Sequence, residues 1–297
     1  MTQRARQHET WKRSSVPGLA ICRLASDWAG TGGPVSWYLD PSLPITTVAR
    51  PMAMSLTVIS LDRTPERWRS FVVNNSGLPF ERFAAVDGYQ IDRQDLVRDG
   101  TITVDNTYAP GALGIAVSHV TLWRRCVATG TPCHVAEDDA VLHPDFLGQV
   151  PALLASLETW DMVYWGWNFD WPMHVHLGPA ARDVVMQFDQ TDMRRRVGEF
   201  RTNKAQWRLV PLLSCAGIGA YSISPRGAAR LLDRCLPIGD KPAGLGPTRG
   251  PLWANTGLDV ELSRHHAGCA SFACLPPLAL LPNDSATSTV QLPARRP

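Results

Sequence analysis

Short apolar runs that alternate with helical patterns are the feature of this chain that most restricts its fold. The strand-like runs lie at 56–61, 81–86, 133–136, 161–166, 209–213 and 219–223. The helical patterns lie between or after them, at 65–75, 112–129, 144–157, 225–235 and 258–264. Strands that alternate with helices are typical of α/β proteins, because each helix carries the chain back to begin a strand parallel to the last. We therefore predict an α/β fold with a mostly parallel central sheet.

The two ends of the chain depart from this pattern. Residues 1–53 begin with a polar, basic stretch and continue with Gly, Pro and Ser at no sustained period. They lack the apolar core of a signal peptide, so we expect a disordered or loosely packed extension. The folded domain is expected over 54–285, followed by a flexible tail at 286–297. Within the domain, 236–253 is rich in Gly and Pro and is predicted to form a long loop.

Composition and charge give no reason to expect nucleic-acid binding or a membrane-spanning segment. The formal net charge of +2 and the absence of a long Lys/Arg block give no reason to expect nucleic-acid binding. No apolar stretch is long enough to span a bilayer. We expect a cytoplasmic protein whose contact with a membrane, at its inner face, is at most peripheral.

The cysteines favour reduced thiols over a disulfide framework. All seven are scattered, and none forms a CxxC pair. One cluster contains ligands that suit zinc, namely His265, His266, Cys269 and Cys274. Its spacing matches no structural zinc pattern, so a zinc site is the less favoured interpretation.

Tryptophan is unusually frequent, with 11 residues, and several lie beside polar residues. These are Trp165, Trp167, Trp171 and Trp253. Most are expected in the core or at its edge. Because carbohydrate-binding clefts also use flat aromatic faces, the excess gives weak support for a sugar ligand.

The strand at 133–136 runs directly into three carboxylates, Glu137-Asp138-Asp139. Like charges this close repel, and burial would cost each of them several kcal/mol of hydration. A divalent metal that shares oxygen ligands with phosphate groups would relieve this repulsion. The carboxyl edge of the sheet is also where open α/β folds bind ligands. A solvated acidic turn between strand and helix remains the alternative.

Five separated segments of the chain form an ordered set of motifs. They are Val58-Ile59-Ser60-Leu61-Asp62-Arg63 with Arg67, Phe83-Ala84-Ala85-Val86-Asp87-Gly88, Gly111-Ala112-Leu113-Gly114 through Ser118-His119, Glu137-Asp138-Asp139, and Gly219-Ala220-Tyr221-Ser222-Ile223-Ser224 with Gly227-Ala228. Taken together and in this order, they resemble glycosyltransferase family 25, the lipooligosaccharide-type galactosyltransferases and their collagen-modifying relatives. The resemblance depends on the ordered set, since no single motif is specific. At Ile115 the chain departs from the family, which often carries Cys there.

The resemblance implies a GT-A-like fold, with a donor-binding half over about 54–166 and an acceptor half over about 167–285. It implies a nucleotide-sugar donor, most often UDP-galactose, and a glycan, glycolipid or protein hydroxyl as acceptor in cell-surface polysaccharide biosynthesis. The acidic triplet resembles the family's DxD element, written here Glu137-x-Asp139. These two residues would bind Mn²⁺ or Mg²⁺, which bridges the diphosphate of the donor.

The same resemblance assigns a donor pocket. Arg67 would face this pocket, although a structural ion pair is an equal alternative. Ser118 and His119 would bind ribose or phosphate, or His119 would orient the acidic loop. A core histidine is the competing interpretation of His119. The other assigned residues are Ser60, Leu61, Asp62, Val86, Asp87 and Asp138.

An inverting transferase, as the family implies, needs a general base for the acceptor hydroxyl. Asp259 is the first choice, because the family has an aspartate near this place. Glu261 and Asp170 are the alternates. A role for Asp259 that is confined to capping its helix stays open.

Two functions from other classes compete with a transferase. A metal-dependent phosphoester hydrolase could use the same acidic triplet, although such sites usually recruit more His and Asp ligands. A non-catalytic sugar-binding or scaffold protein could retain the fold without the reaction. The intact pair of Glu137 and Asp139 argues against the second.

Overall fold

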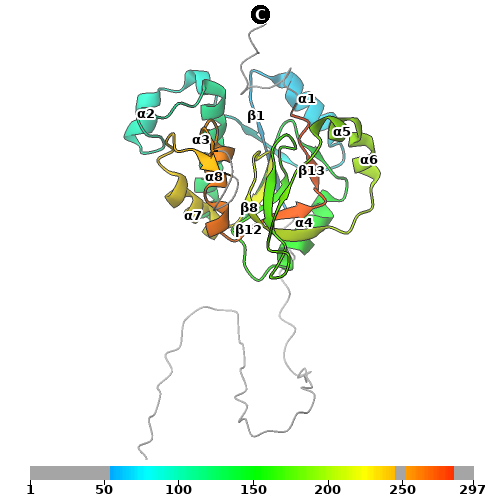
Figure 1. Cartoon of the computed structure of the whole chain (residues 1–297). Helices are drawn as coiled ribbons and strands as arrows, with labels where there is room; N and C mark the ends of the chain where they lie inside the picture. The colour runs from blue at the N-terminus through cyan, green and yellow to red at the C-terminus, as the bar shows by residue number, and fades with distance from the viewer. Residues whose placement is uncertain (1–53, 245–251, 284–297) are drawn as a thin grey trace, which may run out of the picture. The chain divides into compact units, whose positions relative to one another are not determined.

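The computed structural model describes residues 54–244 and 252–283 (Figure 1). The predicted extension at 1–53 and the predicted tail at 286–297 lie outside the described residues. Among the helices described, none is both long enough and apolar enough to cross a membrane.

The elements alternate as the sequence predicts, and the structure adds several short ones. The strands are β1 (Leu56–Ser60), β2 (Glu81–Ala84), β3 (Cys133–Glu137), β4 (Val141–Leu142), β5 (Met162–Gly166), β6 (Met173–His176), β7 (Asp183–Met186), β8 (Arg208–Ser214), β9 (Ala220–Ile223), β10 (Ala243–Gly244), β11 (Leu252–Trp253), β12 (Ser271–Leu275) and β13 (Ala279–Leu280). The helices are α1 (Pro65–Asn74), α2 (Arg93–Arg98), α3 (Pro110–Thr129), α4 (Phe146–Ala155), α5 (Gln190–Arg195), α6 (Val197–Thr202), α7 (Pro225–Cys235) and α8 (Leu258–Ser263), with short 3₁₀ turns η1 (Gly88–Gln90) and η2 (His266–Gly268).

Nine strands form the central sheet, in the order β2-β1-β3-β9-β5-β12-β8-β6-β7. The pairings of β1 with β2 and β3, and of β5 with β12, are parallel, and the other five are antiparallel. The α/β class is therefore confirmed, but the prediction of a mostly parallel sheet is wrong. β9 lies antiparallel between β3 and β5, and β6 and β7 form a hairpin that needs no crossover helix.

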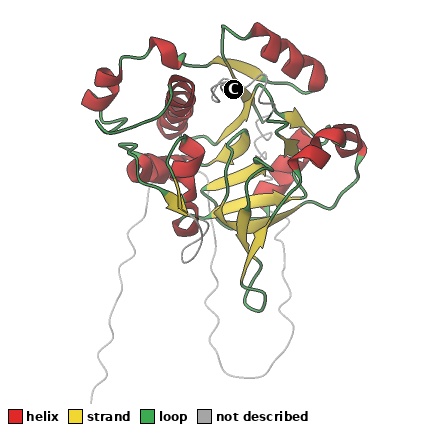
Figure 2. Cartoon of the chain, turned by 45° about the horizontal axis from the view of Figure 1, so that its top comes forward, coloured by secondary structure: helices red, strands yellow, loops and turns green. Residues whose placement is uncertain are grey.

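The sheet is covered on both faces (Figures 1 and 2). Along β5, Met162 and Tyr164 pack into one apolar core, and Val163 and Trp165 pack into another. Figure 1 shows α3, α7 and α8 on one side of the sheet, and α1 and α4 on the other. This alternation along a single strand is what a sheet buried on both faces requires.

The two clearest predicted helices follow from their end residues. In α3, Pro110 occupies the first turn, and Gly130 ends the helix in the left-handed conformation at φ 65°. In α7, the Ser224 hydroxyl accepts a hydrogen bond from the Gly227 N–H at 3.0 Å, and Pro225 follows the cap. Both helices are confirmed.

The predicted loop at 236–253 contains two short strands. β10 and β11 pair antiparallel, with Ala243 opposite Trp253. Residues 245–251 lie outside the described residues.

The turn after β2 lies directly against the start of α3. A Cβ atom on Gly88 would lie 1.6 Å from the Pro110 carbonyl oxygen, and one on Gly114 would lie 2.4 Å from the Val86 oxygen. Ser118 completes the contact, because its hydroxyl donates to the Gly114 carbonyl at 2.7 Å and accepts from the Val86 N–H at 2.9 Å. Glycine at both positions thus lets this turn reach the edge of the candidate site.

Candidate functional site

The acidic triplet lies where β3 ends, between β1 and β9. The Glu137 N–H donates to the Gly219 carbonyl at 2.8 Å, and the Asp138 N–H donates to the Ile59 carbonyl at 3.1 Å. These bonds extend the pairing of the sheet to the triplet and fix its backbone at the carboxyl end of β3.

Arg67, on α1, is the cation closest to the triplet in the described residues. Its Nη2 atom lies 2.7 Å from Asp138 Oδ1 and 3.0 Å from Asp139 Oδ2. The side chains of Arg67 and Asp138 are only 12% and 6% exposed, whereas that of Asp139 is 33% exposed. Arg67 therefore forms an ion pair and also faces the site.

A buried chain of hydrogen bonds supports Glu137 from behind. His119 Nε2 lies 3.2 Å from Glu137 Oε1, and His119 Nδ1 lies 2.8 Å from the Tyr221 hydroxyl. That hydroxyl accepts a bond from Trp123 Nε1 at 3.0 Å. A carboxylate can only accept, so the tautomer of His119 that fits Glu137 carries its proton on Nε2. In that tautomer Nδ1 accepts a hydrogen bond from the Tyr221 hydroxyl, whose pKa burial raises well above its usual value.

We did not predict from the sequence that Tyr221 and Trp123 support His119. Trp123 lies one turn after His119 on α3, and Tyr221 faces Val135 of β3 across the β9 pairing. The helical spacing of His119 and Trp123 was a usable signal, but the contact with Tyr221 depends on the order of the strands.

The electrostatics of the triplet leave negative charge partly uncompensated. Burial raises the pKa of Asp139 to about 6, with Arg67 opposing and the charges of Glu137 and Asp138 adding to the rise. Burial likewise raises the pKa of Asp138. For Glu137, burial is outweighed by the His119 hydrogen bond and by the positive charge of Arg67, so its pKa is lowered.

These residues fit a hard divalent cation. Asp138 Oδ2 is buried and has no hydrogen-bond partner among the described residues. Glu137 and Asp139 both face the same cavity and offer the oxygen ligands that Mn²⁺ and Mg²⁺ prefer. The donor set is therefore suitable for the cation that the sequence predicts.

Two adjoining cavities surround the triplet, and Arg67, Ile115 and Glu137 line both. The first, which we name the β1 cavity, has a volume of about 40 Å³ and is lined among others by Ile59, Leu61, Thr64, Val86, Gly111 and Asp138. The second, which we name the α8 cavity, has a volume of about 300 Å³ and is lined among others by Asp139, Asn168, Asp170, Trp171, Gly217, Thr256, Asp259 and Asn283.

Four of the residues assigned to the donor pocket line the β1 cavity, namely Leu61, Arg67, Val86 and Asp138. Three other assigned residues contact or adjoin the residues that line it. Ser60 is buried between Ile59 and Leu61 in the chain, and His119 bonds to Glu137. Ser118 holds the backbone of Val86 in place.

Two of the assigned aspartates are held by surface contacts. Asp62 is 76% exposed and pairs with Arg82 at 2.6 Å. Asp87 accepts the Tyr89 N–H at the start of η1 and pairs with Arg63 at 3.2 Å. Neither is among the residues that line the two cavities.

Asp259 lies in the first turn of α8 and lines the α8 cavity. Its Oδ2 atom accepts the Gly217 N–H at 3.0 Å. Burial raises the pKa of Asp259, while the backbone N–H groups of Gly217 and Val260 oppose the rise. Asp170, the alternate base, lines the same cavity and accepts a bond from Asn283 Nδ2 at 3.1 Å. The structure thus brings Glu137, Asp139, Asp170 and Asp259 together.

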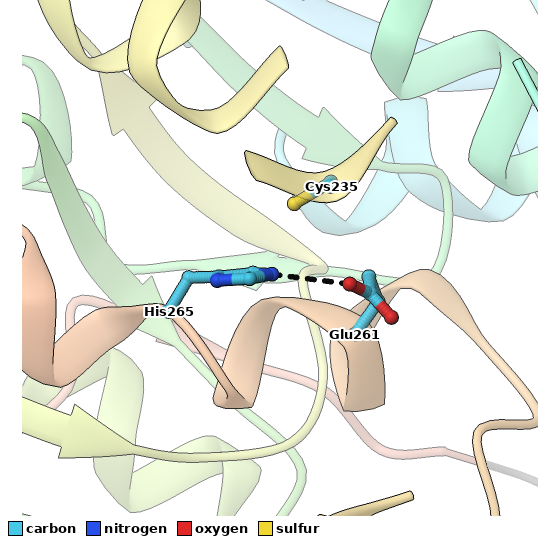
Figure 3. A group of neighbouring side chains, drawn as sticks. All are labelled: Cys235, Glu261 and His265. Carbon is cyan, nitrogen blue, oxygen red and sulfur yellow. Dashed lines mark hydrogen bonds and ion pairs between the residues drawn. The ribbon is translucent and has the colours of Figure 1, made fainter. Parts of the chain in front are cut away.

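Glu261 lies apart from this cavity. It is buried, and its carboxylate accepts from Arg264 Nη1 at 2.7 and 2.9 Å and from Asn255 Nδ2 at 2.6 Å. His265 Nε2 lies 3.1 Å from Oε1 (Figure 3). This position argues against Glu261 as the base, and for a role in holding α8.

The ligands of the disfavoured zinc site do not converge. His266 contacts the Tyr164 hydroxyl at 3.2 Å, and Cys274 lies within β12. In the described part of the chain, only one group of three potential metal ligands has its ligand atoms close together. It consists of Cys235, Glu261 and His265 (Figure 3). Burial raises the pKa of the Cys235 thiol, and the Glu261 oxygens already accept four hydrogen bonds. A structural role fits this trio better than a metal site.

The family described as glycosyltransferase family 25 (LPS biosynthesis protein) matches residues 54–240. No curated protein matches. One similar solved structure, titled "Crystal Structure of A197 from STIV", is 12% identical, with 74% of this chain and 81% of that chain covered and a TM-score of 0.34.

The family match includes β1, the acidic triplet, α3 and β9, the elements that build the wall of the candidate site. It extends over more than half of the chain. The chain therefore belongs to glycosyltransferase family 25, a family of lipopolysaccharide biosynthesis.

Proposed function

We propose that this protein is a metal-dependent, inverting hexosyltransferase that uses a nucleotide diphosphate sugar, with UDP-galactose as the first candidate. The acceptor is a hydroxyl of a glycan, glycolipid or protein in lipopolysaccharide biosynthesis. One observation carries the proposal: Glu137, Asp139 and Asp259 line the same cavity of about 300 Å³. Cation ligands and a candidate base thus face one space, as a transfer between two bound substrates requires.

The donor is expected to lie along the β1 cavity with its diphosphate toward Glu137. The parallel strands β2, β1 and β3, with the triplet at the carboxyl end of β3, support a GT-A-like donor half. The β1 cavity alone is too small to enclose a nucleoside, so the base would lie on its rim or open it on binding.

Glu137 and Asp139 would hold Mn²⁺ or Mg²⁺. When bound, such a cation neutralises the charge that develops on the departing nucleoside diphosphate. His119, fixed by Tyr221, keeps one Glu137 oxygen hydrogen-bonded and so orients the carboxylate. Arg67 adds a fixed positive charge beside the same diphosphate.

Asp259 would remove the proton of the acceptor hydroxyl. The acceptor oxygen attacks the anomeric carbon as the bond to the diphosphate oxygen breaks, and the electron pair of that bond leaves with the nucleotide. The proton passes to Asp259, whose raised pKa makes it a better proton acceptor than an exposed aspartate. Gly217 holds the carboxylate in place.

Titration of UDP-galactose and UDP-glucose by calorimetry, with and without Mn²⁺, tests the proposal. We expect binding that requires Mn²⁺, together with slow release of hexose to water when no acceptor is present. Rapid consumption of UDP-sugars or simple phosphodiesters would favour the hydrolase. Sugar binding that ignores the metal would favour the scaffold.

A further inference from the structure

We propose that Trp171 is the platform on which the sugar ring of the acceptor stacks in the α8 cavity. This inference rests on the proposed function, because it takes the acceptor to be a glycan. The ligand class is a hexopyranose, which presents C–H groups on one face and hydroxyls at its edge.

The four tryptophans that lie beside polar residues in the sequence differ in burial. Trp165 and Trp167 are fully buried in the core. Trp171 is half-buried, follows β5 on the segment that leads to β6, and lines the α8 cavity. An aromatic ring that borders a cavity lined by carboxylates and amides is placed for a ligand with both apolar and hydroxyl surfaces.

Trp253 packs against the Trp171 ring. The two ring centroids lie 4.7 Å apart, with the planes inclined at 58°. Trp253 is fixed in β11 by its pairing with Ala243. Both rings border a residual gap of about 10 Å³ with Pro172 and Ala243, so the Trp171 ring has little free space to turn into on that side. A ring held in this way loses little conformational freedom when a ligand stacks on it.

Hydrogen-bonding groups flank the ring. Asp170, the preceding residue, is held by the side chain of Asn283 at 3.1 Å. Asn168 is fixed through its backbone N–H to the Ala216 carbonyl at 2.9 Å. All three side chains line the α8 cavity. They supply both donors and acceptors for sugar hydroxyls at the edge of a stacked ring.

The position of Trp171 assigns it to the acceptor and not to the donor nucleoside. Trp171 lines the α8 cavity and not the β1 cavity. Glu137 borders both cavities, and Asp139 and Asp259 border only the α8 cavity. A donor whose diphosphate lies at Glu137 would keep its nucleoside on the β1 side, which leaves the Trp171 side for the molecule that receives the sugar.

The test measures saccharide binding to the full chain by saturation-transfer NMR titration. The probes are methyl β-D-galactopyranoside, methyl β-D-glucopyranoside and methyl N-acetyl-β-D-glucosaminide, each alone and with UDP and Mn²⁺. We expect at least one probe to bind, and Trp171→Ala to weaken it about tenfold. Trp171→Phe, which retains a flat ring, should lose no more than about threefold. The matched control is Trp207→Ala, since Trp207 is also half-buried, packs on His143 and lines neither cavity.

The inference is overturned if no probe binds the unmodified protein, or if Trp171→Ala binds as tightly as the unmodified protein. It is also overturned if Trp171→Phe loses as much as Trp171→Ala. A parallel titration of UDP-galactose with Mn²⁺ should be unchanged in every variant, and an equal loss there would assign the ring to the donor. If the unmodified protein does not bind the sugar nucleotide, the proposed function fails. The saccharide titrations without nucleotide would still test whether Trp171 binds a sugar ring.

Discussion

Asp139 has the most exposed side chain of the acidic triplet and faces the α8 cavity. Asp139→Ala is expected to abolish transfer and to weaken Mn²⁺-dependent binding of the nucleotide sugar, because a cation ligand is lost. The melting temperature should change little, since a partly exposed carboxylate contributes little to core packing. Calorimetry and a transfer assay measure both effects.

Asp62→Ala is the matched control, because Asp62 is exposed and lies outside both cavities. Its transfer rate, its Mn²⁺-dependent binding of the nucleotide sugar and its melting temperature should equal those of the unmodified protein. Transfer at the unmodified rate by Asp139→Ala in saturating Mn²⁺ would contradict the assignment of this ligand.

Tyr221 contributes to the site only through His119. Tyr221→Phe removes the donor to Nδ1, so the imidazole can turn or change tautomer and Glu137 loses its fixed orientation. Mn²⁺ affinity is expected to fall about 10- to 100-fold, the usual effect of losing such a support. Paramagnetic titration of Mn²⁺ without any substrate measures it. Tyr89→Phe, at an exposed tyrosine, should have no effect; equal Mn²⁺ affinities in the two variants would exclude this role for Tyr221.

Asp259 can be separated from Asp170 by amide substitution. Asp259→Asn retains the size of the side chain and removes its basicity, so transfer should fall about 10²–10⁴-fold while donor affinity is retained. Asp170→Asn should reduce transfer far less. If the two effects are reversed, the base is Asp170. An equal loss of donor binding in Asp259→Asn would mark the residue as a donor contact.

At the level of elements, the contact between the turn η1 and α3 depends on two glycines. Gly114→Ala would put a methyl group 2.4 Å from the Val86 carbonyl oxygen. The turn must then move, at a cost of about 1–3 kcal/mol in the free energy of unfolding. Urea unfolding measures the loss, and the donor affinity should fall with it, because Val86 lines the β1 cavity.

Gly148→Ala is the matched control within α4, because a Cβ atom there would meet nothing within 4 Å. It should leave stability unchanged or raise it by up to about 1 kcal/mol, as expected for alanine in a helix. Similar losses of unfolding free energy in the two variants would show that the close approach at Gly114 is not the cause of the destabilisation.

Local sequence signals explain which elements were predictable. α3 and α7 carry Pro at their first turn, and α7 has the Ser224 cap. β12, with the sequence Ser-Phe-Ala-Cys-Leu, has no β-branched residue and was missed. The direction of the strands could not be predicted either, because β9 enters between β3 and β5 through contacts that are distant in sequence.

The same limit applies to the candidate site. Glu137, Asp139 and Asp259 could be named from residue type and family resemblance, and all three line the α8 cavity. The contacts of Tyr221 with His119 and of Trp253 with Trp171 could not be predicted, because they depend on the pairing of β9 with β3 and of β10 with β11. Glu261 was proposed on its type alone, and its burial among Arg264, Asn255 and His265 was not visible in the sequence.

Across the whole molecule, the buried imidazole of His266 and the half-buried imidazole of His134 link stability to pH. Burial lowers the pKa of His266 to about 3 and that of His134 to about 4. In the unfolded chain both would titrate near 6.5, so the unfolded state binds more protons as the pH falls below that value. The free energy of unfolding should therefore decrease as the pH drops from about 6.5 toward 4, by up to about 1.4 kcal/mol per pH unit for each histidine.

Urea unfolding at a series of pH values measures this slope. His266→Asn should reduce the slope by removing one titrating group, although the variant will also be less stable at neutral pH because it loses buried packing. An identical slope in the variant and the unmodified protein would rule out His266 as a source of the pH dependence.

Within residues 54–244 and 252–283, the last strand of more than two residues, β12, lies in the middle of the sheet. β12 pairs with β5 on one side and with β8 on the other, so it joins the strands β2-β1-β3-β9-β5 to the strands β8-β6-β7. During synthesis, therefore, the sheet cannot close until residues 271–275 have left the ribosome. Until then β5 and β8 each present an unpaired edge, which is where nascent chains aggregate or recruit chaperones. A message truncated before this point would yield two incomplete sheets, and the cell would have to degrade that product.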